Sequence, residues 1–250
     1  MKAPLLAVTA LSLLSASAFA ADLGPLPYKA PPAPPPLTWT GCYAGVNVDG
    51  GWGRKDMTDT AGFLVANGGP GAASLDIDGY LLGGQVGCDY QFASDWVLGV
   101  EGYAAGGRIG GNALVPVPGD NATFNDTTNF LTSGTARIGY AFGPWLPYIK
   151  GGFAWAGDNY TLADALGTYS AAASEDRFGW TVGAGIEWLF ARDWSLKLEY
   201  DYYGFGTQAV QFVDGNGLIN GGNPFPVDIK QNIQVVKLGV NFHFWAGETP

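Results

Sequence analysis

Apolar and polar residues alternate along most of this chain in short runs. In the last run, residues 237–244, every even-numbered position is apolar and every odd-numbered position is polar or glycine. Successive side chains of a β-strand point to opposite faces, so such a run has one apolar and one polar face. The predicted strands are 39–53, 77–92, 96–106, 130–142, 146–156, 177–190, 194–205 and 232–244. Eight such strands predict an all-β protein, an antiparallel transmembrane β-barrel with an apolar outer face.

The connections between these strands alternate in length. Three are short, at 93–95, 143–144 and 191–193, and four are long, at 54–76, 107–129, 157–176 and 206–231. Short periplasmic turns and four long extracellular loops are the pattern of an outer-membrane barrel. Aromatic residues gather at both ends of the strands, which predicts two girdles at the two membrane interfaces. They are Trp39, Phe92, Trp96, Trp145, Phe190, Trp194 and Phe244 beside the short turns, and Trp52, Tyr80, Phe130, Trp155, Trp180 and Phe205 toward the long ones.

The N-terminus has the features of a cleaved secretory signal. Lys2 precedes a short apolar run at 3–14, and Ala18-Phe19-Ala20 forms a small-x-small cleavage site. A proline-rich stretch follows, which favours extended polyproline II over a sheet. The predicted organisation is a signal peptide at 1–20, a Pro-rich periplasmic leader at 21–38, an outer-membrane β-barrel at 39–244 and a short C-terminal tail at 245–250.

Composition and charge narrow the class further. The chain has 39 glycines, 14% aromatic and only 14% charged residues, and it holds no uninterrupted apolar run long enough for a membrane helix. Its formal net charge of −10 argues against nucleic-acid binding. The predicted location is the cell outer membrane.

Charged residues fall on the faces opposite the apolar ones and therefore point into the predicted lumen. A buried charge must be paired or reach water, so an interior ion-pair network is expected. We expect Glu101 to pair with Arg137 and Glu187 to pair with Lys197, because each pair lies on neighbouring strands. The network residues are Glu101, Arg137, Lys150, Glu187, Lys197, Glu199 and Lys237.

The sequence indicates no catalytic, cofactor or metal site. Its single histidine, His243, has no serine near it on its own strand, and no Gly-x-Ser-x-Gly motif is present. One histidine and two cysteines do not have zinc-site spacing. Four acids, Asp56, Asp59, Asp76 and Asp78, lie near the first long connection but lack the Asp-x-Asp-x-Asp-Gly pattern of a calcium loop, so we interpret them as solvated.

Several segments resemble the alphaproteobacterial porin family of small outer-membrane proteins, the immunogenic surface barrels related to the OmpA-type membrane domain. The segments that carry the resemblance are 39–47 (WTGCYAGVN), 83–87 (GGQVG), 137–142 (RIGYAF), 179–187 (GWTVGAGIE) and 236–241 (VKLGVN). The resemblance covers essentially the whole chain and implies an eight-stranded barrel with a structural or surface role. Its motifs are specific to the family and not to any activity.

Two features depart from that family. Cys42 and Cys88 stand where aromatic residues are usual, near the periplasmic ends of two adjacent strands, so they either form a cross-strand disulfide or remain free thiols. The chain also continues past Phe244, although such barrels commonly end at this aromatic. We interpret Gly239, Phe242 and Phe244 as the assembly signal.

The sequence thus predicts a non-enzymatic surface barrel whose lumen is filled by side chains. The expected partners are outer-membrane lipid and lipopolysaccharide, and the barrel-assembly machinery during insertion; the sequence does not name what the loops bind. Three alternatives stay open: a narrow porin for small solutes, a lipid-modifying outer-membrane enzyme and a soluble ligand-binding barrel of the lipocalin type.

Overall fold

The computed structural model describes residues 37–60, 62, 65, 71–117, 120–164, 170–214 and 223–244. The chain divides into two units, Met1–Pro36 and Leu37–Pro250, and all of the described residues belong to the second. The predicted signal peptide, the leader up to residue 36 and the tail at 245–250 therefore lie outside the described residues.

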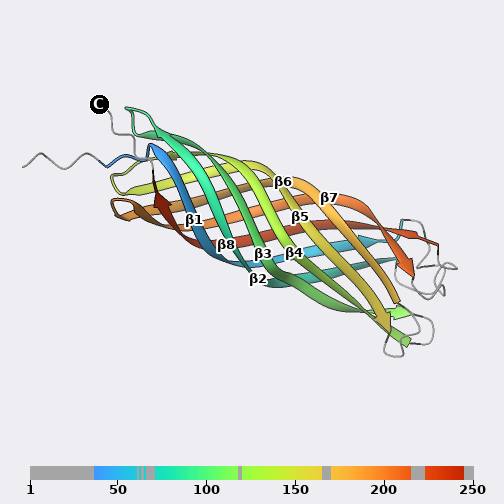
Figure 1. Ribbon diagram of the computed structural model, residues 1–250. Helices are drawn as coiled ribbons and strands as arrows, with labels where there is room; N and C mark the ends of the chain where they lie inside the picture. The colour runs from blue at the N-terminus through green and yellow to red at the C-terminus, as the bar shows by residue number, and fades with distance from the viewer. Residues whose placement is uncertain are drawn as a thin grey trace, which may run out of the picture. The chain divides into compact units, whose positions relative to one another are not determined.

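Within these ranges the chain forms eight strands. They are β1 (Gly41–Thr58), β2 (Ala72–Gln91), β3 (Trp96–Val117), β4 (Asp120–Tyr140), β5 (Trp145–Asp164), β6 (Ser170–Ala191), β7 (Trp194–Asp214) and β8 (Phe225–His243). Each pairs antiparallel with the next, and β8 pairs with β1, so the sheet closes into a barrel of tilted strands (Figure 1). This confirms the predicted fold class. The described residues contain no helix that is long and apolar enough to cross a membrane.

In the half of the barrel nearest the short turns, the predicted faces are the observed ones. On β7, Lys197 and Glu199 are buried in the lumen, whereas Leu198 between them is 51% exposed on the outer surface. An eight-stranded barrel has an interior only wide enough for side chains, so inward residues must pack against each other across it. The outer face of this half is suited to lipid.

The strands continue well beyond the predicted ends. In these extensions the apolar residues lie on the inward face and the polar residues on the outward face, the reverse of the first half. On β8, Val236 and Leu238 point outward, but Ile229 and Ile233 point inward. We call this second half the lobe, and the rest of the barrel the membrane section. The lobe comprises residues 53–58, 72–79, 107–117, 120–129, 156–164, 170–177, 205–214 and 225–234.

The lobe encloses a large apolar core and presents mostly polar side chains to the outside, with Leu114 and Val213 as apolar exceptions. Its core includes Leu75, Ile77, Ile109, Phe124, Leu162, Val210, Phe212, Phe225, Val227, Ile229 and Ile233. A polar outer surface cannot face hydrocarbon, so the lobe projects beyond the membrane. The four long connections are accordingly shorter than predicted, at 59–71, 118–119, 165–169 and 215–224, because strands occupy most of the rest.

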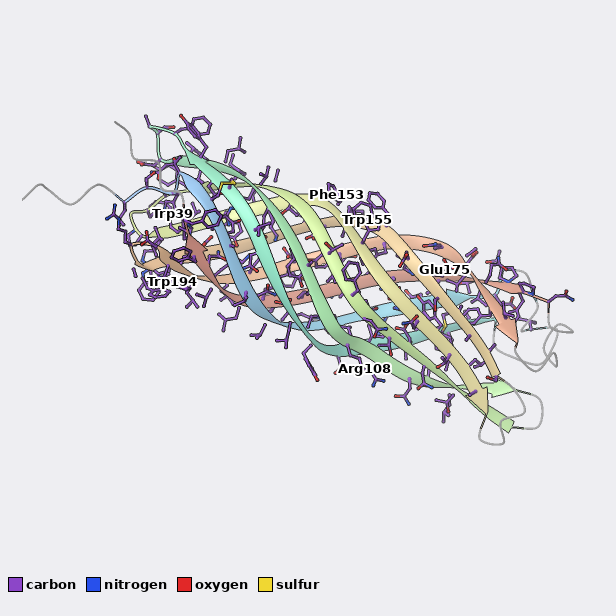
Figure 2. All side chains as sticks on the ribbon, viewed as in Figure 1. Trp39, Arg108, Phe153, Trp155, Glu175 and Trp194 are labelled. Atoms are coloured by element: carbon purple, nitrogen blue, oxygen red, sulfur yellow. A yellow bond between two sulfur atoms is a disulfide. The ribbon has the colours of Figure 1, made fainter. Side chains whose placement is uncertain are left out.

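Two rings of exposed aromatics border the membrane section. On β5, Trp145 and Trp155 lie ten positions apart, which matches the roughly 9–11 residues that a tilted strand needs to cross a bilayer. Trp145 stacks on Trp188 of β6, with ring centroids 5.4 Å apart. Figure 2 shows Trp194 at the end with the short turns and Trp155 farther along the barrel toward the lobe.

Two of the predicted girdle residues are corrected by the structure. Trp39 is only 2% exposed and lies inside the barrel end, because it precedes β1 and does not follow the alternation of that strand. Phe205 is 6% exposed and stacks on Tyr203 in the interior, since it shares the inward face of β7 and marks the start of the reversed pattern.

Candidate functional site in the barrel lumen

All seven predicted network residues lie buried in the lumen, from six different strands. Lys150 Nζ lies 3.0 Å from Glu101 Oε1 and 2.6 Å from Glu199 Oε1. Lys197 Nζ lies 2.9 Å from Glu101 Oε2. Lys237 Nζ completes this central cluster at 3.5 Å from Glu199. The central cluster therefore joins β3, β5, β7 and β8 through the middle of the barrel.

Aspartates extend the network in both directions. Asp201 Oδ2 accepts from Lys237 Nζ at 2.6 Å, on the lobe side of the central cluster. Toward the short turns, Arg137 forms a two-point contact with Asp89, with Nε to Oδ1 at 2.8 Å, and reaches Glu187 at 3.0 Å. Asp89 and Asp201 are buried in the lumen as well, and the predicted set of seven did not include them.

The expected pairs within this network are wrong. Glu187 and Lys197 are register partners on β6 and β7, yet Glu187 contacts Arg137 and Lys197 contacts Glu101. Glu101 and Arg137 likewise form no ion pair with each other. In so narrow a lumen the opposite wall is within reach of a long side chain, so adjacency on the sheet does not decide the partner.

A serine–histidine–glutamate group, which the sequence reasoning missed, lies near the barrel end. Ser195 Oγ donates to Glu187 Oε1 at 2.5 Å and lies 2.9 Å from His243 Nε2. Glu187 is 3.5 Å from the same Nε2 atom, so it does not orient the imidazole through the other nitrogen as a catalytic triad requires. The serine proton is already directed to the carboxylate, and Ser195 is fully buried. The contact joins two paired strands, since Ser195 of β7 lies opposite Asn241, two positions before His243 on β8. The sequence reasoning considered only serines on the strand of His243.

The barrel end beside the short turns is closed by Trp39. Its backbone N donates to the Gln91 side chain at 2.9 Å, and its indole Nε1 donates to the Gly143 carbonyl at 3.2 Å. The ring packs edge-on against His243 and within an apolar cluster that includes Leu146. Trp39 thus covers the network from the short-turn end.

The lobe holds a second buried ion cluster, which we call the lobe cluster. Lys55 Nζ lies 2.8 Å from Asp126 and 3.2 Å from Asp158, and Arg177 Nε lies 3.0 Å from Asp158. Arg177 also donates to the backbone carbonyl of Ile229 at 2.9 Å. Desolvation by burial, opposed by Lys55, raises the pKa of Asp126 to about 6. The sequence reasoning missed this cluster because Lys55, Asp126 and Asp158 fell in predicted connections, and Arg177 was the first residue of a predicted strand.

Cys42 and Cys88 form a disulfide in the structure, with an S–S distance of 2.03 Å. The two are direct partners in the β1–β2 ladder, close to the short-turn end of both strands. Of the two outcomes that the sequence left open, the geometry supports the bridge.

The C-terminal aromatics lie on the outer face where the barrel closes. Phe242 packs against Trp194 of β7, and Phe244, just past the last residue of β8, is exposed. The Phe244 backbone N donates to the Cys42 carbonyl at 3.0 Å. The last strand is thereby fastened to the first up to this residue.

The acids near the first connection lie on the outside of the lobe. Asp76 accepts from Arg54 at 2.9 Å, and Asp56 accepts from Ser74 at 2.7 Å. Over the described part of the chain, no group of three or more His, Cys, Asp and Glu side chains is arranged to hold a metal ion.

Comparison with known proteins places this geometry among outer-membrane barrels. Residues 6–244 match the family model of the outer membrane protein beta-barrel domain. The chain is 29% identical over 251 residues to the 31 kDa outer-membrane immunogenic protein of Brucella melitensis, covering 98% of this chain and 100% of the relative. It is 30% identical over 214 residues to the 25 kDa outer-membrane immunogenic protein of Brucella ovis, covering 83% of this chain and 92% of that one.

A solved structure gives the same fold. The outer membrane protein OprG from Pseudomonas aeruginosa superimposes with a TM-score of 0.52 at 15% identity, over 82% of this chain and 97% of that chain. At this identity the likeness concerns the architecture alone.

Proposed function

The chain belongs to the outer membrane protein beta-barrel domain family, and on that premise we propose that it is a sealed, non-enzymatic barrel that displays its lobe and connections at the cell surface. It is an outer-membrane protein, like its immunogenic relatives. The soluble lipocalin-type alternative is therefore discarded. In the proposed role, the membrane section anchors the protein and the lobe holds surface segments away from the lipid.

The filling of the interior carries this proposal. Three layers follow each other along the axis: the apolar cluster around Trp39, the ion network of the membrane section, and an apolar core in which the lobe cluster is embedded. A dry apolar layer excludes hydrated ions, so the apolar layers at the two ends of the ion network leave no continuous path for them through the barrel. This arrangement favours a sealed barrel over the narrow porin.

Bilayer recordings test the sealed state. We expect the purified full-length barrel, refolded and inserted into planar bilayers, to give no steady ion current. A wide porin reconstituted in the same lipid serves as the positive control for insertion and recording. A steady, large conductance from the unmutated barrel would overturn the proposal and favour the porin.

A lipid-modifying enzyme is the second alternative. Ser195 is the best candidate for a catalytic nucleophile among the described residues, but it is buried and its hydroxyl already donates to Glu187. We therefore expect identical lipid-A mass spectra from cells with the gene and cells without it. A modified lipid A that disappears on Ser195→Ala, with the folded barrel still present, would establish the enzyme.

The proposed partners follow from the surface. The two aromatic rings suit outer-membrane lipid, and Arg108, exposed at the base of the lobe (Figure 2), is placed for contact with the phosphates of lipopolysaccharide. During insertion the barrel would be handled by the barrel-assembly machinery through Gly239, Phe242 and Phe244.

Phe244→Ala should lower the amount of folded barrel in the outer membrane several-fold, whereas deletion of 245–250 should leave it unchanged or raise it. The reason is the spacing of Gly239, Phe242 and Phe244, which is that of a terminal strand signal. Heat-modifiable gel migration of outer-membrane fractions measures the folded amount. If the deletion abolishes assembly, the signal lies in the tail and not in the strand.

A further inference from the structure

One buried carboxylate in the lumen stands apart from all others. Among the described residues, eight carboxylates are buried, and seven have a lysine or arginine nitrogen within 4.0 Å. Those seven are Asp89, Glu101, Asp126, Asp158, Glu187, Glu199 and Asp201. Asp49 on β1 is 3% exposed and has no such partner. An unpaired buried charge is costly, so Asp49 requires neutralisation from another source.

The contacts of Asp49 are hydrogen bonds from neutral groups. The Tyr103 hydroxyl donates to Oδ2 at 2.6 Å, and the Asn47 amide donates to Oδ1. Lys237 lies directly opposite Asp49 in the β1–β8 register, but its ammonium group contacts Asp201 at 2.6 Å and the Tyr203 hydroxyl at 2.8 Å. The nearest lysine in the ladder is therefore held by another carboxylate.

Two further oxygens on this wall of the lumen are buried without a hydrogen-bond donor: Oδ1 of Asn47, which contacts Asp49, and Oε1 of Gln85 on the neighbouring strand. Each belongs to an amide whose nitrogen is occupied, since Asn47 Nδ2 donates to Asp49 and Gln85 Nε2 donates to Asn241 Oδ1 at 2.6 Å. Both side chains approach Gly239. A Cβ at that position would lie 3.1 Å from Gln85 Nε2 and 3.3 Å from Asn47 Cβ, so the glycine provides their space.

We propose that Asp49, Asn47 and Gln85 bind a monovalent cation of the Na⁺ or K⁺ type within the lumen. Carboxylate and amide oxygens are the donors that hard cations prefer. A single carboxylate matches a single positive charge, whereas a calcium ion takes six to eight oxygens, usually from several carboxylates. The cation neutralises Asp49 and satisfies both amide oxygens at once.

The position of this site gives the cation a structural task. Asp49 and Asn47 belong to β1, Gln85 belongs to β2, and Gly239 belongs to β8. The ladder between β1 and β8 is the one that closes the barrel. A cation bound here ties the first strand to its neighbour on the lumen side of that closure.

Unfolding in different salts tests the proposal. The full-length barrel is unfolded by urea in lipid vesicles, in NaCl, KCl or choline chloride at equal ionic strength. In the wild type we expect the folding equilibrium constant to rise about tenfold for each tenfold rise in Na⁺ or K⁺ above the dissociation constant, and not with choline. Asp49→Asn should abolish this cation dependence. Asp126→Asn in the lobe cluster, where the charges already balance, should retain it.

A direct measurement covers the case in which Asp49→Asn does not fold. Wild-type barrel refolded in NaCl or KCl is exchanged into choline buffer, and the retained metal is measured by flame emission. We expect about one ion per barrel in the wild type and fewer in Gln85→Met, which lacks the amide oxygen. No retained ion, together with equal stability in sodium and choline, would show that Asp49 is neutralised by a proton and would overturn the proposal.

Discussion

Arg137→Ala should lower the free energy of unfolding of the barrel by about 3–5 kcal/mol, the usual cost of leaving a buried charge without its partner. Arg137 is the cation that contacts both Asp89 and Glu187, and all three side chains are buried. Its guanidinium also lies over the ring of Tyr43, with its carbon 4.7 Å from the ring centroid. Removing it leaves two carboxylates facing each other in a lumen closed by Trp39.

A charge-free variant separates the effect of unpaired charge from that of lost packing. The triple variant Asp89→Asn/Arg137→Gln/Glu187→Gln keeps most of the side-chain volume. It also removes all three of the charges that meet at this contact. We expect this triple variant to be more stable than Arg137→Ala alone. Urea unfolding in lipid vesicles, followed by tryptophan fluorescence, measures both. If both variants lower the free energy of unfolding equally, lost packing and not unpaired charge causes the destabilisation.

The membrane section could be predicted because lipid imposes a strict pattern. A side chain such as Leu198 must be apolar to face hydrocarbon, and its neighbours Lys197 and Glu199 are then assigned to the lumen by alternation alone. The lobe was not predicted because its outer face contacts water, so polar residues point outward there and apolar residues point inward. On β8, the apolar residue faces outward at Leu238 but inward at Ile229. Residues 206–231 lack the outward apolar pattern of the membrane section and were predicted as a connection.

The members of the lumen network could be predicted, but their partners could not. Alternation decides only whether a side chain points inward, and that is a local property. Whether Lys197 pairs with Glu187 or with Glu101 depends on distances across the barrel, which follow from its closure and tilt. Trp39 was misplaced for a related reason, since it precedes β1 and its position is set by contacts with distant Gln91 and Gly143.

Loss of the disulfide should be the other large effect. Cys42 and Cys88 are 46 positions apart, and a cross-link closing a loop of this length stabilises by about 4 kcal/mol in the chain-entropy model. Cys42→Ala/Cys88→Ala should therefore lower the free energy of unfolding by up to that amount. The two single variants should match the double variant, because either change removes the same bridge. Urea unfolding under non-reducing conditions measures all three.

Chemical reduction provides the matched control for this prediction. Reduced wild-type protein should unfold like the double alanine variant, and reductant should not affect that variant. The bridge joins β1 to β2 at a direct ladder position, and the Cys42 carbonyl accepts from Phe244 at the end of the last strand. The bridge therefore fixes one side of the strand on which the barrel closes. Two free thiols in non-reduced protein, found by alkylation and mass spectrometry, would contradict this account, and the closure would then depend on backbone pairing and lumen contacts alone.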